Sequence, residues 1–193
     1  MMFEQLRKKL DSSWIRKNEP WDIVVYGSYA RGGSETRDID LAIILRKPTP
    51  VKTKMALCQE LRRMLAGAGY SLDVKAVDIN DFLNPGFLGR EAILAEGRSL
   101  LKKDYLAERF GFQAVALAQY SFKGLSASRQ KMFYYALQGR KKGTGLLAKM
   151  NGKIVSKGLL QVPVRHYEEI RSLIEQHKLH CTTTFALQYR ILH

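Results

Sequence analysis

The sequence is poor in cysteine and has no long apolar run. Its 193 residues include only Cys58 and Cys181, whose spacing does not match that of metal ligands, and such low cysteine usage is typical of a reducing compartment. No apolar stretch approaches the roughly 20 residues that a membrane-spanning helix requires. The N-terminal residues MMFEQLRKKLD are interrupted by charges, unlike a signal peptide. We therefore expect a cytoplasmic protein with no membrane partner.

Acidic residues are scarce in the C-terminal half. Residues 1–101 hold 16 basic and 13 acidic residues, whereas residues 102–193 hold 16 basic and 5 acidic residues. Between Glu108 and Glu168 no acidic residue occurs; we call residues 109–167 the acid-free segment. A solvent-exposed surface ordinarily mixes both signs of charge, so this composition predicts a polyanionic partner, with RNA as the expected one.

The hydrophobic pattern predicts an α+β fold in two domains, 1–101 and 102–193. In the first domain it favours helices over 3–17, 51–66 and 87–96, and strands over 22–26, 38–45, 70–78 and 97–101. In the second it favours helices over 105–120, 126–139 and 164–176, and a β-hairpin over 144–162 around Asn151-Gly152. Residues 179–193 fit either a strand or a helix.

The stretch from Val24 to Leu45, VVYGSYARGGSETRDIDLAIIL, carries the chemistry. Asp38 and Asp40 flank one residue, and side chains alternate along a strand, so both carboxylates point to the same side. Two like charges this close favour a divalent cation between them. Upstream, Gly27-Ser28 ends an apolar run, where glycine permits a sharp turn whose amides can face an anion.

This pattern resembles the DNA polymerase β-type nucleotidyltransferase superfamily. It consists of Gly-Ser, nine intervening residues, and Asp-apolar-Asp-apolar, and the form GSYARGG is most similar to the minimal nucleotidyltransferase branch. The resemblance covers about Trp21 to Leu101. It implies a mixed sheet with flanking helices as a catalytic domain, residues 1–101. It does not extend to residues 102–193, where the charge and the hydrophobic pattern predict a basic helix and β-hairpin domain that binds nucleic acid or the acceptor. On the residues alone, a surface hairpin with two exposed aspartates remains the alternative.

The resemblance also implies a site. Asp38, Asp40 and a third carboxylate would hold Mg²⁺, with two ions when a nucleoside triphosphate is bound. Gly27, Ser28 and Arg31 would bind the triphosphate, for which ATP is the expected source. Ser28 and Arg31 are three residues apart, so on a helical turn they share a side. Nucleotidyl transfer to a hydroxyl would then release pyrophosphate.

Asp73 is the predicted third carboxylate. The superfamily carries this residue on a strand beside the Asp-x-Asp strand, and Asp73 lies in a matching apolar context, Leu-Asp-Val. Asp78 and Asp81 lie at or beyond the strand's end, where either can instead cap the next helix. Asp73 also has a structural alternative as the partner of Lys75, because side chains two apart share a strand face.

The acid-free segment supplies the predicted nucleic-acid contacts. These residues are basic and lie near aromatic residues or on a glycine-flanked loop: Lys123, Arg129, Lys131, Arg140, Lys141 and Lys142. The predicted function is Mg²⁺-dependent transfer of a nucleoside monophosphate from NTP to a hydroxyl on RNA. The alternatives are an antitoxin that adenylylates a partner toxin protein, and a catalytically inactive nucleic-acid-binding protein.

Overall fold

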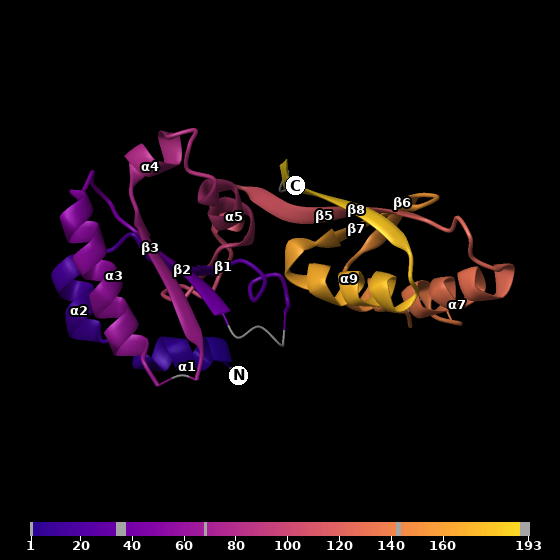
Figure 1. The fold of residues 1–193 in the computed structure, drawn as a ribbon, viewed down its shortest axis with the longest axis horizontal. Helices are drawn as coiled ribbons and strands as arrows, with labels where there is room; N and C mark the ends of the chain where they lie inside the picture. The colour runs from indigo at the N-terminus through magenta and orange to yellow at the C-terminus, as the bar shows by residue number, and fades with distance from the viewer. Residues whose placement is uncertain (1, 34–37, 68, 142–143, 190–193) are drawn as a thin grey trace. The chain divides into compact units, whose positions relative to one another are not determined.

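The computed structural model describes residues 2–33, 38–67, 69–141 and 144–189. The chain forms two compact units, Met1–Phe110 and Gly111–His193, whose elements are drawn in Figure 1. The first unit contains α1 (Met2–Lys9), α2 (Ser12–Asn18), β1 (Asp22–Tyr26), β2 (Asp38–Ile44), α3 (Val51–Leu65), β3 (Ser71–Val77), α4 (Ile79–Leu83), α5 (Gly89–Glu96), β4 (Arg98–Ser99) and α6 (Leu106–Arg109). The second contains β5 (Phe112–Ser121), α7 (Ala127–Gln138), α8 (Leu146–Lys149), β6 (Lys153–Ser156), β7 (Leu159–Pro163), a 3-10 turn (Val164–His166), α9 (Tyr167–Gln176) and β8 (His180–Tyr189).

The first unit is built on a mixed sheet in the order β3-β2-β1-β4. β1 is antiparallel to β2 and β4, whereas β2 and β3 run parallel. This arrangement confirms the predicted α+β architecture with a mixed sheet. β2 is apolar on both faces after its two aspartates, as expected for a strand covered on both sides.

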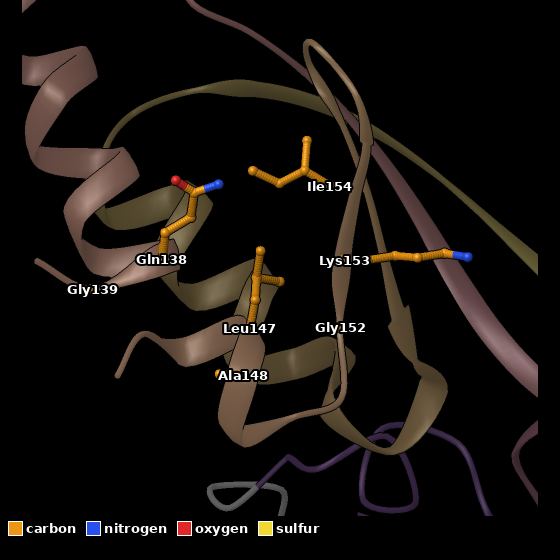
Figure 2. Close-up of a pocket in the computed structure, with 7 residues that line it drawn as sticks. All are labelled: Gln138, Gly139, Leu147, Ala148, Gly152, Lys153 and Ile154. Atoms are coloured by element: carbon orange, nitrogen blue, oxygen red, sulfur yellow. The ribbon is translucent and has the colours of Figure 1, made fainter. Parts of the chain in front are cut away.

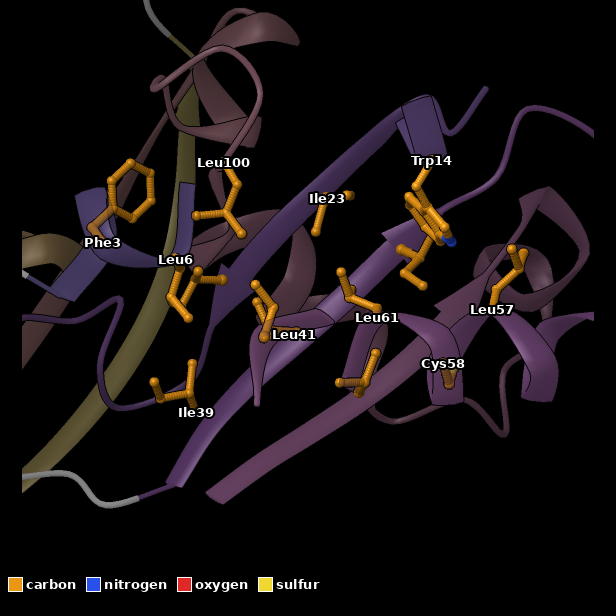
Figure 3. Close-up of a cluster of buried hydrophobic side chains, with 14 of the residues drawn as sticks. Phe3, Leu6, Trp14, Ile23, Ile39, Leu41, Leu57, Cys58, Leu61 and Leu100 are labelled. Carbon is orange, nitrogen blue, oxygen red and sulfur yellow. The ribbon is translucent and has the colours of Figure 1, made fainter. Parts of the chain in front are cut away.

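Helices cover both faces of this sheet. On one face, alternate residues of the strands pack against α1, α2 and α3, and Figure 3 shows their side chains converging in one cluster that includes Ile23, Ile39, Leu41, Leu61 and Trp14. On the other face, a second buried cluster joins Val24, Tyr26, Ala42, Ile44, Val77, Ile93 and Leu106. Because Asp38 and Asp40 alternate with Ile39 and Leu41, they project from the second face, which α5 covers in part.

The single N-terminal helix predicted over 3–17 is two helices. The apolar spacing is helical as predicted, but Asp11 accepts a hydrogen bond from the Ser13 amide and caps α2. An N-cap residue has a non-helical backbone, so Asp11 divides the segment.

Residues beyond Leu101 belong to the first unit. The carboxylate of Asp22 is fully buried, accepts a hydrogen bond from Ser99 Oγ, and pairs with Arg109 on α6. Arg109 also pairs with Asp104. This network closes the unit at its C-terminal end, nine residues later than the predicted boundary.

The second unit is an antiparallel sheet in the order β6-β7-β5-β8 with helices packed on one face. Figure 1 shows α7 and α9 along one side of this sheet. The core joins alanines of β5 to the side chains of Phe133, Leu137, Leu147, Ile170 and Ile174. The helices predicted over 126–139 and 164–176 are confirmed, with Ser126 as the N-cap of α7.

The helix predicted over 105–120 is wrong. Only Leu106–Arg109 is helical, and Phe112–Ser121 forms the central strand β5. The alanines of β5 fit helical spacing, but Ala116, Ala118 and Tyr120 also alternate, and they form its core face. Pairing with β7 and β8 on both sides outweighs the helical propensity of alanine.

The hairpin predicted around Asn151-Gly152 is also misplaced. The observed hairpin joins β6 and β7 through Lys157-Gly158. Asn151 adopts a left-handed backbone with φ of 54°, and the Gly152 amide donates to the Leu147 carbonyl at 2.8 Å. The Asn-Gly pair therefore ends α8, because a helix C-terminus and a tight hairpin require the same positive φ.

Candidate active site

Asp40 and Asp73 lie side by side across the first sheet. The strand register pairs Tyr26 with Asp40 and Asp40 with Asp73, and neighbouring strands are about 4.8 Å apart. Asp38 lies two residues earlier on β2, opposite Ser71, and is exposed. The three carboxylates predicted from the sequence are thus brought to one end of one face.

Gly27 begins a hydrogen-bonded turn, which we call the Gly-Ser turn (residues 27–33). Gly27 has φ of 77°, and a Cβ at this position would lie 2.2 Å from Asp40 Oδ2. The Arg31 amide donates to the Gly27 carbonyl, and the Gly33 amide donates to the Ser28 carbonyl. Glycine is therefore required both for the backbone conformation and for the close approach of the turn to the carboxylate.

Glu96 organises the Gly-Ser turn and was not predicted from the sequence. Its side chain is only 5% exposed, and Oε2 accepts a hydrogen bond from the Gly27 amide at 2.9 Å. The Arg31 guanidinium lies 3.0 Å from Glu96 Oε1. The Gly27 amide, which was expected to face a phosphate, is thus engaged by Glu96. Glu96 is the last residue of α5, where a carboxylate interacts unfavourably with the helix dipole. This unusual position is the feature of the sequence from which a special role for Glu96 could have been predicted.

Asp40 is held in an unfavourable electrostatic environment. Burial raises the pKa of Asp40, and the neighbouring charge of Asp73 raises it further. Lys75 and Arg31 act in the opposite direction. Such competition between burial, like charges and cations is common where a carboxylate serves a function.

Asp73 makes the ion pair that the sequence left as an alternative. Lys75 Nζ lies 3.3 Å from Asp73 Oδ2, and Arg62 Nη2 lies 3.7 Å from Asp73 Oδ1. The Asp73 side chain is 49% exposed. Within the described ranges, no three histidine, cysteine or acidic side chains are gathered closely enough to hold a metal ion. Lys75 and Arg62 occupy Asp73 instead.

Asp78 and Asp81 form a capping box at the start of α4. Asp78 accepts hydrogen bonds from the amides of Asn80 and Asp81, and Asp81 accepts one from the Asp78 amide. Both carboxylates also pair with Lys54 at 2.7 Å. Asp78 is five positions beyond Asp73, about 16 Å along an extended chain. The geometry therefore favours Asp73 over Asp78 as the carboxylate beside Asp40.

The predicted nucleic-acid contacts of the second unit are exposed. They are Lys123, Arg129, Lys131, Arg140 and Lys141; Lys142 lies outside the described residues. Tyr135 on α7 is 41% exposed, and both Lys131 Nζ and Arg140 Cζ lie 5.6 Å from its ring centroid. An exposed ring near two cations matches the chemistry of base stacking beside a phosphate chain.

A pocket of about 590 Å³ lies beside the C-terminal end of α7. Figure 2 shows Gln138, Leu147 and Ile154 turned toward a common space, whereas Lys153 points away from it. Lys153, the charged residue among the described lining residues, therefore does not face the cavity. The described residues of the lining offer apolar and amide contacts to this space.

Comparison with known proteins gives one match. The family model described as "Polymerase beta, Nucleotidyltransferase" matches residues 8–106, just over half of the chain. No match to the chain was found among curated proteins or among solved structures. In the part of the chain that the structure describes, no helix combines the length and apolar character needed to cross a membrane.

Proposed function

Since the chain belongs to the polymerase β nucleotidyltransferase family, we propose that it transfers a nucleoside monophosphate from NTP, with ATP as the expected donor, to a hydroxyl on RNA. The observation that carries this proposal is the register of Asp40 with Asp73 directly beside the Gly-Ser turn. A nucleotide's phosphates and a metal-binding carboxylate pair would then meet at one point.

The chemistry of these residues fits a divalent ion, although in the described ranges their carboxylates are not gathered around one point. Asp38, Asp40 and Asp73 supply carboxylate oxygens, which Mg²⁺ prefers, and the absence of a Cβ at Gly27 lets the Gly-Ser turn lie directly against Asp40 Oδ2. Asp38, Asp40 and Asp73 would hold the metal. Mg²⁺ held by these carboxylates, as two ions when NTP is bound, would neutralise charge on the triphosphate and lower the pKa of the attacking hydroxyl.

The chain's own groups position the nucleotide. Ser28 follows the Gly-Ser turn's first residue, where its hydroxyl can donate to a phosphate oxygen. Arg31 is held by its ion pair with Glu96, and its charge also acts on Asp40. A guanidinium held in place beside the carboxylates is suited to stabilising charge on the leaving pyrophosphate.

The exposed basic residues of the acid-free segment support RNA as the acceptor. Lys123, Arg129, Lys131, Arg140 and Lys141 are exposed. Lysines and arginines that neutralise phosphates release condensed counterions, which favours binding of any single strand. Tyr135, with its flanking cations, adds a stacking surface that tolerates any base.

The test is to incubate the full chain with each α-³²P-labelled NTP, Mg²⁺, and either total RNA or total protein. We expect label in RNA, sensitive to ribonuclease, with release of pyrophosphate. Asp40→Asn should give no label, and Lys47→Ala, a change at an exposed loop residue, should label RNA as the wild type does.

The other outcomes identify the alternatives. Label in the protein fraction alone would reject RNA as the acceptor and favour a protein-modifying enzyme of the antitoxin kind. Label in neither fraction, together with tight RNA binding, would favour an inactive nucleic-acid-binding protein.

A further inference from the structure

One cation of the first unit lies among the candidate active-site carboxylates. Lys75 follows Asp73 by two positions on β3, so both side chains project from the same face. Its ammonium lies 3.3 Å from Asp73 Oδ2. The residue beside Lys75 on β2 is Ala42, whose small side chain leaves room for the lysine stem over the sheet.

Lys75 acts on the neighbouring groups as well. It opposes the rise that burial and Asp73 cause in the pKa of Asp40. Because the strand register places Asp40 beside Asp73, the ammonium that pairs with Asp73 also acts on Asp40.

We infer that Lys75 is the counter-ion of Asp40 and Asp73 in the nucleotide-free protein and becomes a ligand of the triphosphate when metal and NTP bind. The inference rests on the proposed function. Adjacent carboxylates repel each other unless cations lie near them. Arg62 pairs with Asp73 and Arg31 acts on Asp40, and Lys75 is the cation that acts on both.

Metal binding requires Lys75 to move. A divalent ion on Asp40 and Asp73 repels a neighbouring ammonium, so the two cations compete for the same oxygens. The triphosphate arrives with the metal and brings new anionic oxygens to this face. Lysine binds phosphate as a flexible point charge, so the displaced ammonium gains a partner there.

The surroundings of Lys75 allow this movement. Its side chain is 47% exposed and lines a cleft of about 480 Å³ along the outer edge of β3. Arg62, Met55 and Phe87 also line this cleft. The ammonium can therefore leave Asp73 without displacing a buried side chain.

The test compares Lys75→Met, which removes the charge and keeps the stem, with Lys75→Arg and with Lys52→Met, a change at an exposed lysine of α3. Mn²⁺ binding without nucleotide is measured by electron paramagnetic resonance. Binding of non-hydrolysable NTP analogues with Mn²⁺ is measured by calorimetry. Circular dichroism checks the fold of each variant.

We expect two opposite effects in Lys75→Met. Mn²⁺ alone should bind about tenfold more tightly because its competitor is gone, and the nucleotide should bind about tenfold more weakly because it loses a charged ligand. Lys75→Arg should keep both affinities near those of the wild type, and Lys52→Met should change neither.

An unchanged affinity for Mn²⁺ or for nucleotide in folded Lys75→Met would overturn the inference, and so would two changes in the same direction. If Asp40→Asn abolishes nucleotide binding but Lys75→Met does not, the proposed role of Lys75 is rejected while the proposed function still stands. Failure of the wild type to bind Mn²⁺ and nucleotide would reject the proposed function and this inference with it.

Discussion

Gly27 lies so close to Asp40 that no side chain fits between them. A Cβ at Gly27 would lie 2.2 Å from Asp40 Oδ2. Nine residues separate Ser28 from Asp38 in the sequence, but in the folded unit the Gly-Ser turn and β2 pack directly against each other. Five predictions follow from this site and from the basic second unit.

Gly27→Ala should abolish nucleotidyl transfer and lower the free energy of unfolding by about 2 kcal/mol. Alanine is strained at a φ of 77° and its Cβ meets the carboxylate. Urea denaturation and the labelling assay measure the two effects. The control is Gly124→Ala, where φ is 83° but nothing lies within 4 Å of the added atom. Equal losses of activity in both variants would contradict the role of the close approach.

Asp73→Asn and Asp78→Asn should have opposite profiles. Asp73 is half exposed, so its replacement should remove transfer and leave stability within about 0.5 kcal/mol. Asp78 is buried, caps α4 and pairs with Lys54, so its replacement should cost about 2 kcal/mol. Activity that survives in Asp73→Asn and is lost in a folded Asp78→Asn would show that Asp78 is the third carboxylate.

Asp40→Asn should stabilise the nucleotide-free protein in a pH-dependent way. Burial raises the pKa of Asp40 above its ordinary value of 3.8, so the folded state holds the proton more tightly than the unfolded state. The stability that the folded state gains from the protonated Asp40 is complete below pH 3.8 and is lost as pH rises through the raised pKa. The Tm of the variant relative to the wild type should therefore be higher at pH 7 than at pH 3, by about 2 °C. A difference in Tm between the variant and the wild type that does not vary with pH would contradict the destabilising effect of the ionised Asp40 carboxylate.

Glu96→Gln should destabilise the first unit by about 1–2 kcal/mol. The substitution keeps an oxygen for the Gly27 amide but removes the charge that faces Arg31 in a buried position. Glu91→Gln is the matched control, since Glu91 lies on the same helix with a side chain 65% exposed. Equal urea midpoints for the two variants would show that the Arg31 pair adds nothing to stability.

Replacing Arg140, Lys141 and Lys142 together with alanine should weaken RNA binding for all sequences. Each phosphate contact contributes about −0.7 to the slope of log affinity against log salt for single strands, so the slope should become shallower. The control replaces Lys17, Lys47 and Lys52, three exposed lysines of the first unit. Nucleotide binding should be unaffected in both. Equal affinities and salt slopes in the two triple variants would show that these charges serve solubility only.

The sequence predicted the first unit well because its signals are local. The apolar run before Gly27, the glycine itself and the alternation of Asp38 and Asp40 with apolar residues each determine structure over a few residues. Glu96 escaped prediction because its partners, Gly27 and Arg31, are 69 and 65 residues away. The position of Glu96 at a helix C-terminus marks it as unusual, but no short-range pattern identifies Gly27 and Arg31 as its partners.

The second unit was harder to predict because its strands depend on distant partners. The alanines of β5 are compatible with helix or strand, and pairing with β7 and β8 decides between them. The Asn151-Gly152 pair correctly indicated a residue with positive φ, which Asn151 has. A positive φ is found at the end of a helix as well as in a hairpin turn, so the pair did not indicate which of the two forms.

The ion pair between Asp22 and Arg109 determines where the first unit can be divided. The two residues are 87 positions apart, at the start of the unit's first strand and at the end of its last helix. A fragment that ends at Leu101 would leave a fully buried carboxylate without its guanidinium, at a cost of about 3–5 kcal/mol. An autonomous fragment, or a chimera with another member of the family, must therefore keep the segment through Phe110 together with the strand that begins at Asp22.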